Sequence, residues 1–453
     1  MMLALITLSI AGLMAMFFGF VKSRNLIMPF VFLTTLAALF FIIVKQPFWN
    51  HYLTDMVETT GNSRILSILL LLNGLALIPF YNHYQQRGEE ELADFLGLVL
   101  FSMVGAVLMV TSINYICLFI GVEILSIAMY ILAGADRRKS KSNEAALKYF
   151  ISGSFTSAVL LFGIGLLYAT NGSLAISQPA GSTNEWLIQV AYLFVFSGFA
   201  LKIAVVPFHF WAPDVYEGTP TLFTALMASL VKIASIGAFL RIVQLNLDHL
   251  PNWLNAYFIL VILATMTFGN LFAMKQQSVK RLMAYSGIVQ AGFIMLGFLS
   301  MRTGEDWPVL FYFIAYALSS IVAFVVIHFV EQQSGSDALD SFNGLFRSNP
   351  LLAIVMTIAL VSLAGAPFTS GFIAKLFVLN QAVSSGHTAL VVIVVLCTLI
   401  SVYYYYRIIN AMYNGSADKP YRLSFVHALL LTVFSFLTLL AGVIPDYFVS
   451  LLR

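Results

Sequence analysis

The sequence predicts an all-α integral membrane protein with about fourteen transmembrane helices. Of its 453 residues, 60% are hydrophobic and only 9% are charged, against roughly 25% charged residues in a typical soluble domain. The mean hydropathy is +0.92. So few charged side chains cannot cover a globule of 50.0 kDa, which excludes a cytosolic enzyme, a secreted domain and a disordered chain. The formal net charge of +3 gives no indication of a nucleic-acid partner.

Apolar stretches of roughly 20 residues, long enough to cross about 30 Å of hydrocarbon as helices, recur along the whole chain. A polar break at Thr111–Asn114 divides the longest of them. We expect spans 1 to 14 at residues 2–21, 26–44, 65–82, 94–111, 114–133, 147–169, 187–211, 221–244, 253–273, 281–300, 308–330, 350–383, 388–413 and 426–450.

The distribution of basic residues predicts the orientation of these spans. With the N-terminus outside, fourteen basic residues fall in inner loops: Lys22, Arg24, Arg87, Arg137, Arg138, Lys139, Lys141, Lys275, Lys280, Arg281, Arg347, Arg407, Lys419 and Arg422. Only five fall in outer loops and the tail: Lys45, Arg64, Arg241, Arg302 and Arg453. Inner loops normally carry the excess of lysine and arginine, so we expect both termini on the outer, periplasmic side. The first span has no basic residue before it and no cleavage site behind it, so we expect it to remain as a span.

The four basic residues that are not assigned to loops or the tail, Lys148, Lys202, Lys232 and Lys375, fall within predicted spans, and Glu123 lies in the middle of span 5. Each costs roughly 2.5–3.5 kcal/mol at a helix centre, although a lysine near a helix end, such as Lys148, can extend to the interface. Buried ion pairs are the structural alternative, but one carboxylate cannot neutralise four lysines. Burial favours a neutral amine and an approaching carboxylate favours the ammonium. A row of such groups therefore predicts a proton relay.

Two spans contain helix-breaking residues near their centres. Span 7 has Pro207, Pro213 and Pro220, and span 12 has Pro367 and Gly371. Proline removes a backbone donor and clashes with the preceding turn, so we expect both helices to be broken within the membrane. Irregular backbone at that depth is tolerated only where it is buried in protein or lines a wet cavity, which favours a functional site at each break.

The breaks also indicate an internal repeat. A Pro-Phe step occurs at Pro207 and again at Pro367, five spans apart. A unit repeated after an odd number of spans inserts upside down, so we expect inverted five-helix repeats over spans 4–8 and 9–13. The lysines are not equivalent, because superposing the prolines places Lys202 on Ser362. We expect one membrane domain over 1–453, with spans 1–3 in 1–90, the repeats in 91–245 and 250–415, and span 14 in 425–453.

Other reactive residue types give weaker signals. His209 beside the span 7 break and His328 in span 11 are secondary relay candidates, and a structural hydrogen-bonding role is at least as favoured for each. Cys117 and Cys397 lie in apolar runs, so we expect buried thiols. The sequence has neither a glycine-rich phosphate loop nor a cysteine cluster, so we expect no cofactor, no metal and no redox chemistry in this chain.

Four segments resemble a known family: GVEILS, LKIAVVPFHFWAPDVYEGTPT, KRLMAYSGIVQAGFIMLG and SLAGAPFTSGFIAKL. They are similar to the antiporter-like subunits of proton-pumping NADH:quinone oxidoreductase, respiratory complex I, over about residues 90–415. The resemblance implies fourteen core helices with inverted repeats over spans 4–8 and 9–13. The chain looks most like subunit N: it stops after span 14, where subunit L has a lateral helix, and it has Lys375 where subunit M usually has glutamate.

The resemblance also implies roles for the charged residues. Glu123 would pair with Lys202 in the first half-channel, and Lys232 would be the central link. Lys375 would connect to the periplasmic side, and Lys148 would occupy a further relay position. At the inner end of span 4, the family often has a second glutamate, and this chain has Asp94 there.

The resemblance further implies a hetero-oligomer in a bacterial cell inner membrane. The partners would be lipids, the antiporter-like subunits M and L and the small subunit K, with NADH, FMN, iron–sulfur clusters and quinone bound in partner subunits. Two alternatives stay open. One is a subunit of an Mrp-type cation/proton antiporter or of a membrane-bound hydrogenase, and the other is a structural spacer without transport activity.

Overall fold

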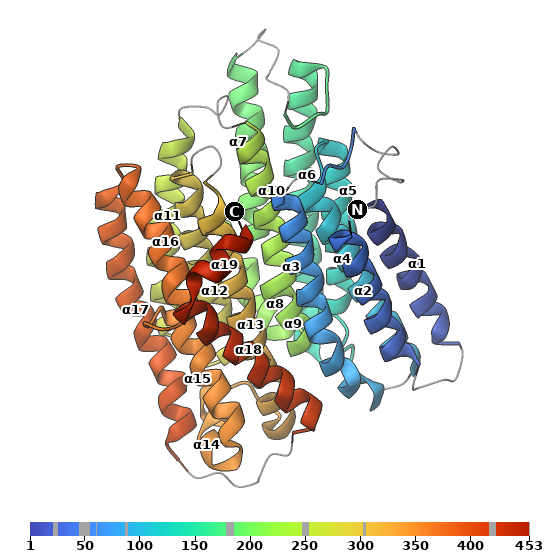
Figure 1. Ribbon diagram of the computed structural model, residues 1–453, viewed down its shortest axis with the longest axis vertical. Coiled ribbons are helices and arrows are strands. Elements are labelled where there is room, and N and C mark those ends of the chain that lie inside the picture. Colours follow the sequence, from blue (N-terminus) through green and yellow to red (C-terminus); the bar gives the residue numbers. More distant parts are fainter. Residues whose placement is uncertain are drawn as a thin grey trace. The chain divides into compact units, whose positions relative to one another are not determined.

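The computed structural model describes residues 1–20, 26–44, 55–59, 61–86, 89–177, 185–246, 253–301, 305–415 and 423–452. Within these ranges the regular structure is helical, with only isolated β-bridges besides (Figure 1), so the all-α membrane fold is confirmed. Eleven helices of the described ranges are long and apolar enough to cross a membrane, and three apolar helices are shorter. The count of fourteen spans and the inverted repeats stay predictions. Cys117 and Cys397 are buried free thiols, as expected.

The chain divides into two compact units, and the expected single membrane domain with two repeats stays a prediction. Unit 1 contains Met1–Ile203 and Gly218–Pro251, and unit 2 contains Ala204–Glu217 and Asn252–Arg453. The division near residue 251 falls where we placed the boundary between repeats. The segment Ala204–Glu217, however, which we assigned to the first repeat, packs with unit 2.

Unit 1 is built around α4 and α5. Its helical elements are α1 (Met2–Phe18), α2 (Ile27–Ile43), α3 (Gly61–Leu77), the 3-10 helix η2 (Ile78–Gln86), α4 (Glu89–Thr111), α5 (Tyr115–Ala133), α6 (Ser140–Asn171), α7 (Glu185–Ile203), α9 (Thr221–Leu226), the π-helix η3 (Met227–Val231) and α10 (Lys232–Leu245). Helices α4 and α5 approach closely at Gly105, where a Cβ atom would lie 2.5 Å from the backbone nitrogen of Leu125. Small residues permit such close packing of membrane helices.

Unit 2 is built around α12 and α13, whose residues are almost all buried. Its helical elements are α8 (Trp211–Gly218, of which Gly218 groups with unit 1), α11 (Trp253–Met274), α12 (Val279–Leu299), α13 (Trp307–Ser334), the 3-10 helix η5 (Leu339–Phe342), α14 (Leu345–Ser348), α15 (Pro350–Ala364), α16 (Ser370–Ser384), α17 (Thr388–Tyr413), α18 (Phe425–Val443) and α19 (Pro445–Leu452).

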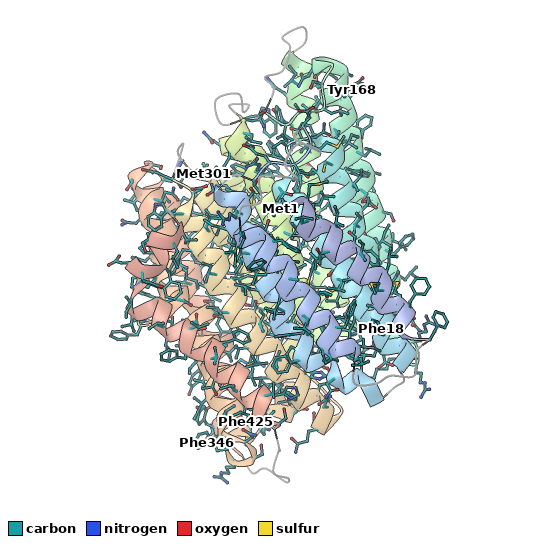
Figure 2. The ribbon with its side chains drawn as sticks, turned by 45° about the vertical axis from the view of Figure 1, so that its right-hand side comes forward. Met1, Phe18, Tyr168, Met301, Phe346 and Phe425 are labelled. Carbon is teal, nitrogen blue, oxygen red and sulfur yellow. The ribbon has the colours of Figure 1, made fainter. Side chains whose placement is uncertain are left out.

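The outward sides of many helices are apolar. Phe155 of α6, Leu399 of α17 and Phe436 of α18 are each more than 60% exposed. Side chains such as Tyr168 and Phe425 stand out from the ribbon in Figure 2. An exposed apolar surface of this extent is unusual for a soluble protein and fits contact with hydrocarbon.

Span 7 is broken at Pro207 as expected, and the chain is interrupted again at Pro220, between α8 and α9. Helix α7 ends at Ile203, Pro207 lies in the irregular segment that follows, and α8 begins at Trp211. Our assignment of Pro213 as a second break is wrong, because Pro213 lies in the first turn of α8. The first turn tolerates proline, since its N–H groups have no partner within the helix.

Span 12 is broken between α15 and α16, with Pro367 in the break. Gly371 does not break a helix, contrary to our assignment; it is the second residue of α16. A Cβ atom at this position would lie 2.0 Å from the carbonyl oxygen of Ser362. Gly371 therefore permits the two half-helices to approach closely.

Three other helices differ from the expected spans. Span 6 is longer, because α6 begins at Ser140 and its polar first turns carry an ion pair between Glu144 and Lys148. Span 8 contains the π-helix η3. Span 14 is divided at Pro445, which starts α19. The orientation stays a prediction, since eight of its basic residues lie outside the described ranges: Lys22, Arg24, Lys45, Arg87, Arg302, Lys419, Arg422 and Arg453.

Candidate functional site

One face of α5 carries Glu123 and Ser126, two polar residues of the candidate site in unit 1. The helix is capped by Asn114, whose side chain accepts a hydrogen bond from the backbone N–H of Ile116. Glu123 lies near the middle of α5, and its carboxylate accepts a hydrogen bond from Ser157 of α6. One turn later Ser126 accepts a hydrogen bond from the ammonium of Lys202. Residues three apart share a helix face, so α5 holds the carboxylate and the ammonium one turn apart.

Lys202 occupies the last turn of α7, directly before the span 7 break, and only 8% of the residue is exposed. Its Nζ atom lies 5.9 Å from the centroid of the Tyr130 ring. The C-terminal turn of a helix presents unpaired carbonyls and a negative field that favours a cation. The family resemblance implied a direct pair of Lys202 with Glu123; among the described residues, the hydrogen-bond partner of Lys202 is Ser126.

The other candidates of unit 1 lie in different surroundings. Lys148 forms an ion pair of 2.7 Å with Glu144 on α6, and its side chain is 42% exposed. Asp94 is exposed near the start of α4. These two residues therefore lie at the surface of the unit in this structure.

Lys232 is 5% exposed and directly follows the π-helix η3. The most apolar 18-residue stretch of the helix Thr221–Leu245 around it is entirely buried. Short π-helical segments occur often at functional sites. No feature of the sequence indicated this one, because π-helices have no reliable residue signature.

In unit 2, Lys375 lies at the break of span 12 and is 6% exposed. Its ammonium donates hydrogen bonds to the carbonyls of Leu363 at 2.8 Å and Ala364 at 3.0 Å. These carbonyls belong to the last turn of α15, which Gly365 ends with a φ of +89°. The Nζ atom also lies 4.7 Å from the centroid of the Phe293 ring, a distance that permits a cation–π contact.

The two candidate histidines are both buried in unit 2. His209, in the segment after Pro207, is 3% exposed and stacks on Phe272 with ring centroids 6.2 Å apart. Its Nδ1 atom has no hydrogen-bond partner among the described residues. His328 is 5% exposed and lies beside Phe329 in α13. The described contacts do not bring either histidine next to a candidate lysine.

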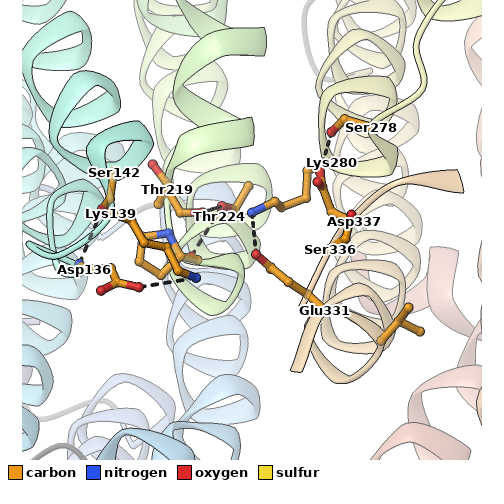
Figure 3. Close-up of polar contacts among 12 residues, drawn as sticks. Asp136, Lys139, Ser142, Thr219, Thr224, Ser278, Lys280, Glu331, Ser336 and Asp337 are labelled. Carbon is orange, nitrogen blue, oxygen red and sulfur yellow. Dashed lines mark hydrogen bonds and ion pairs between the residues drawn. The ribbon is translucent and has the colours of Figure 1, made fainter. Parts of the chain in front are cut away.

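Sequence reasoning missed two sets of charged contacts near the N-terminus of α12. Lys280, which we had assigned to an inner loop, is 4% exposed and lies 3.2 Å from Glu331 of α13 (Figure 3). Arg281 donates to Asp214 at 2.6 Å and to Glu217 at 3.1 Å, both on α8. The spacing of the two carboxylates, three residues apart, was the available signal.

No group of three or more histidine, cysteine, aspartate or glutamate residues in the described ranges lies close enough to hold a metal ion. The buried cations at the helix breaks remain the main chemical feature. Hydroxyl and carbonyl oxygens accept hydrogen bonds from Lys202 and Lys375.

The sequence and fold of this chain are similar to those of known proteins. Residues 112–401 match the family described as "NADH:quinone oxidoreductase/Mrp antiporter, TM". The chain belongs to this family. It is 38% identical over 427 residues to NADH-quinone oxidoreductase subunit N of Flavobacterium johnsoniae, covering 92% of each chain.

Solved structures of this antiporter family have the same fold. A chain of respiratory complex I from Thermus thermophilus with bound aureothin superposes with a TM-score of 0.84 at 29% identity, over 99% of this chain and 98% of that one. A chain of the Mrp complex from Dietzia sp. DQ12-45-1b gives a TM-score of 0.87 at 21% identity, over 99% and 95%. The second likeness concerns the fold alone.

Proposed function

We propose that this chain is the N subunit of a bacterial NADH:quinone oxidoreductase and moves protons across the membrane. Quinone reduction elsewhere in the complex drives the transport, and Glu123, Lys202, Lys232 and Lys375 form the relay. Lys148 is a further relay position, whereas His209, His328 and Asp94 are secondary candidates. The name of a relative that is 38% identical to this chain, NADH-quinone oxidoreductase subunit N, supports the complex to which we assign it.

The observation that carries the proposal is the environment of the buried lysines. Lys202 and Lys375 are each more than 90% buried. Among the described residues, their hydrogen-bond partners are a serine hydroxyl and two backbone carbonyls, not carboxylates. A lysine that served only to lock helices together would need a carboxylate in contact, because an uncompensated buried charge is strongly destabilising. A charge kept without such a partner favours a role in transport.

The proposal includes partners and cofactors. The chain acts in a hetero-oligomer with the antiporter-like subunits M and L, the small subunit K and lipids, in a cell inner membrane with both termini periplasmic. NADH, FMN, iron–sulfur clusters and quinone belong to partner subunits. This chain contributes no redox group and takes part in the enzyme only as its proton-translocating part.

A subunit of an Mrp-type antiporter or of a membrane-bound hydrogenase is the alternative. Its support is fold similarity at 21% identity, which is weaker than the support from the relatives named subunit N. Sodium-dependent transport, and copurification with antiporter subunits instead of a redox arm, would favour this alternative.

The test uses the assembled complex in sealed vesicles. Lys202→Ala and Lys375→Ala are compared with Lys139→Ala, which removes a lysine that is 66% exposed and lies 3.4 Å from Asp136 (Figure 3). NADH oxidation and proton pumping are measured together. We expect lower pumping in both buried-lysine variants and wild-type pumping in the control. Wild-type pumping in all three would refute the relay, and loss of assembly without a change in pumping per NADH would favour a spacer.

A further inference from the structure

One backbone carbonyl at the span 12 break accepts hydrogen bonds from two side chains. The carbonyl oxygen of Leu363 lies 2.8 Å from the Nζ atom of Lys375 and 2.9 Å from the Nε2 atom of Gln290 in α12. Lys375 and Gln290 are 6% and 2% exposed. A carbonyl oxygen has two lone pairs and can hold both donors at once. Lys375 and Gln290 are therefore linked through a shared acceptor.

The orientation of Gln290 is fixed by hydroxyl groups from two other helices. Its Oε1 atom accepts a hydrogen bond from Tyr312 of α13. Its Nε2 atom lies 3.4 Å from the hydroxyl of Tyr405 in α17, which in turn is hydrogen-bonded to Ser286. All four residues are at most 2% exposed. With its oxygen held by Tyr312, the amide nitrogen of Gln290 faces Leu363.

The shared acceptor has a consequence for a lysine that exchanges protons. The last carbonyls of a helix have no partner within it, and Lys375 satisfies two of them at the end of α15. When Lys375 turns away from the end of α15 to pass on its proton, a buried carbonyl without a second donor would be left unpaired, which is costly. An amide does not titrate, so Gln290 keeps the Leu363 carbonyl bonded in every state of Lys375.

We propose that Gln290 is a positioning residue for Lys375, which holds the end of α15 so that the lysine can release it and bind it again. This inference rests on the proposed role of Lys375 in proton transport. It assigns to the Gln290 amide a function that a packing residue of the same size cannot perform.

The test compares two substitutions of Gln290 in the assembled complex. Gln290→Met keeps the size of the side chain and removes the N–H donor, whereas Gln290→His keeps an N–H donor. Gln276→Met is the matched control, because the Nε2 atom of Gln276 also donates to a backbone carbonyl, that of Phe272 at 2.9 Å, but at an exposed position. We expect Gln290→Met to lower the rate of proton pumping by about tenfold, the effect of one hydrogen bond on a rate constant. We expect Gln290→His to retain most pumping and Gln276→Met to retain all of it.

The outcomes separate this inference from the proposed function. Wild-type pumping by Gln290→Met, or equal loss in the Met and His variants, would overturn the positioning role. If Lys375→Ala itself pumps normally, the proposed relay is wrong. If Gln290→Met does not assemble, Tyr312→Phe serves instead, since it frees the amide to rotate. We expect it to pump less than wild type, and wild-type pumping by that variant would overturn the inference.

Discussion

Substituting Gly371 by alanine should separate the two halves of span 12. The new Cβ atom would lie 2.0 Å from the carbonyl oxygen and 2.7 Å from the carbonyl carbon of Ser362, where ordinary contacts begin at 3.4 Å. Both atoms are backbone, so neither can rotate away. The first turn of α16 must therefore move by about 1 Å or more from α15, at a cost of about 1–3 kcal/mol for an overpacked site.

The same movement affects Lys375, one turn further along α16. Its hydrogen bonds to Leu363 and Ala364 measure 2.8 and 3.0 Å, and a rigid shift of the helix by about 1 Å or more weakens or breaks both. Gly371→Ala is thus expected to lower the proton pumping per NADH. It is also expected to lower the temperature at which half of the pumping is lost on heating.

The matched control is Gly165→Ala, in the interior of α6. A Cβ atom there would meet nothing within 4 Å, and alanine is favoured over glycine in a helix by roughly 0.5–1 kcal/mol. Both variants are assayed as assembled complex in vesicles, with pumping and its thermal loss measured on the same samples. If Gly371→Ala equals Gly165→Ala in proton pumping per NADH and in the temperature at which half of it is lost, the close approach of α15 and α16 does not position Lys375.

Two further substitutions are tested with the same measurements. Ser126→Ala removes the hydroxyl to which Lys202 donates, so we expect reduced pumping. The control Ser152→Ala removes a hydroxyl that donates to the carbonyl of Tyr149 in its own helix, and it should pump normally. Glu331→Gln removes the charge that Lys280 contacts at 3.2 Å. Because Lys280 is buried and Glu331 is 23% exposed, we expect Glu331→Gln to lower the free energy of unfolding by about 3 kcal/mol or somewhat less. The variant should then lose its pumping at a lower temperature than the wild type. An unchanged temperature of half-loss would contradict this expectation.

The fold was predictable wherever one local property decides it. Apolar length gave the helices, and Pro207 and Pro367 gave the two breaks, since a proline within a span disrupts its hydrogen bonds whatever surrounds it. Pro213 and Gly371 were misassigned because their effect depends on where the next helix starts. That start is set by contacts with residues distant in the sequence, such as Ser362 beside Gly371.

The buried lysines could be predicted from the sequence, but the side chains that contact them could not. Composition identified Lys202, Lys232 and Lys375, because a charge within an apolar span is conspicuous. It could not identify Ser126 or Gln290, since serine and glutamine are common and cost little within a membrane helix. The π-helix before Lys232 was equally hidden, as it reflects packing around the helix.

The two breaks show why the lysines share an environment without sharing a sequence position. Lys202 belongs to the half-helix before its break, and it lies in the last turn of that half-helix. Lys375 belongs to the half-helix after its break, and it reaches back to the last carbonyls of α15. Both lysines are thus associated with the C-terminal end of the first half-helix, Lys202 by its position in the last turn and Lys375 by its hydrogen bonds, and the helix dipole favours a positive charge there. An alignment on the prolines pairs Lys202 with Ser362 because it compares chain positions. Both breaks have a lysine associated with the C-terminal end of the first half-helix. That lysine can belong to either half-helix.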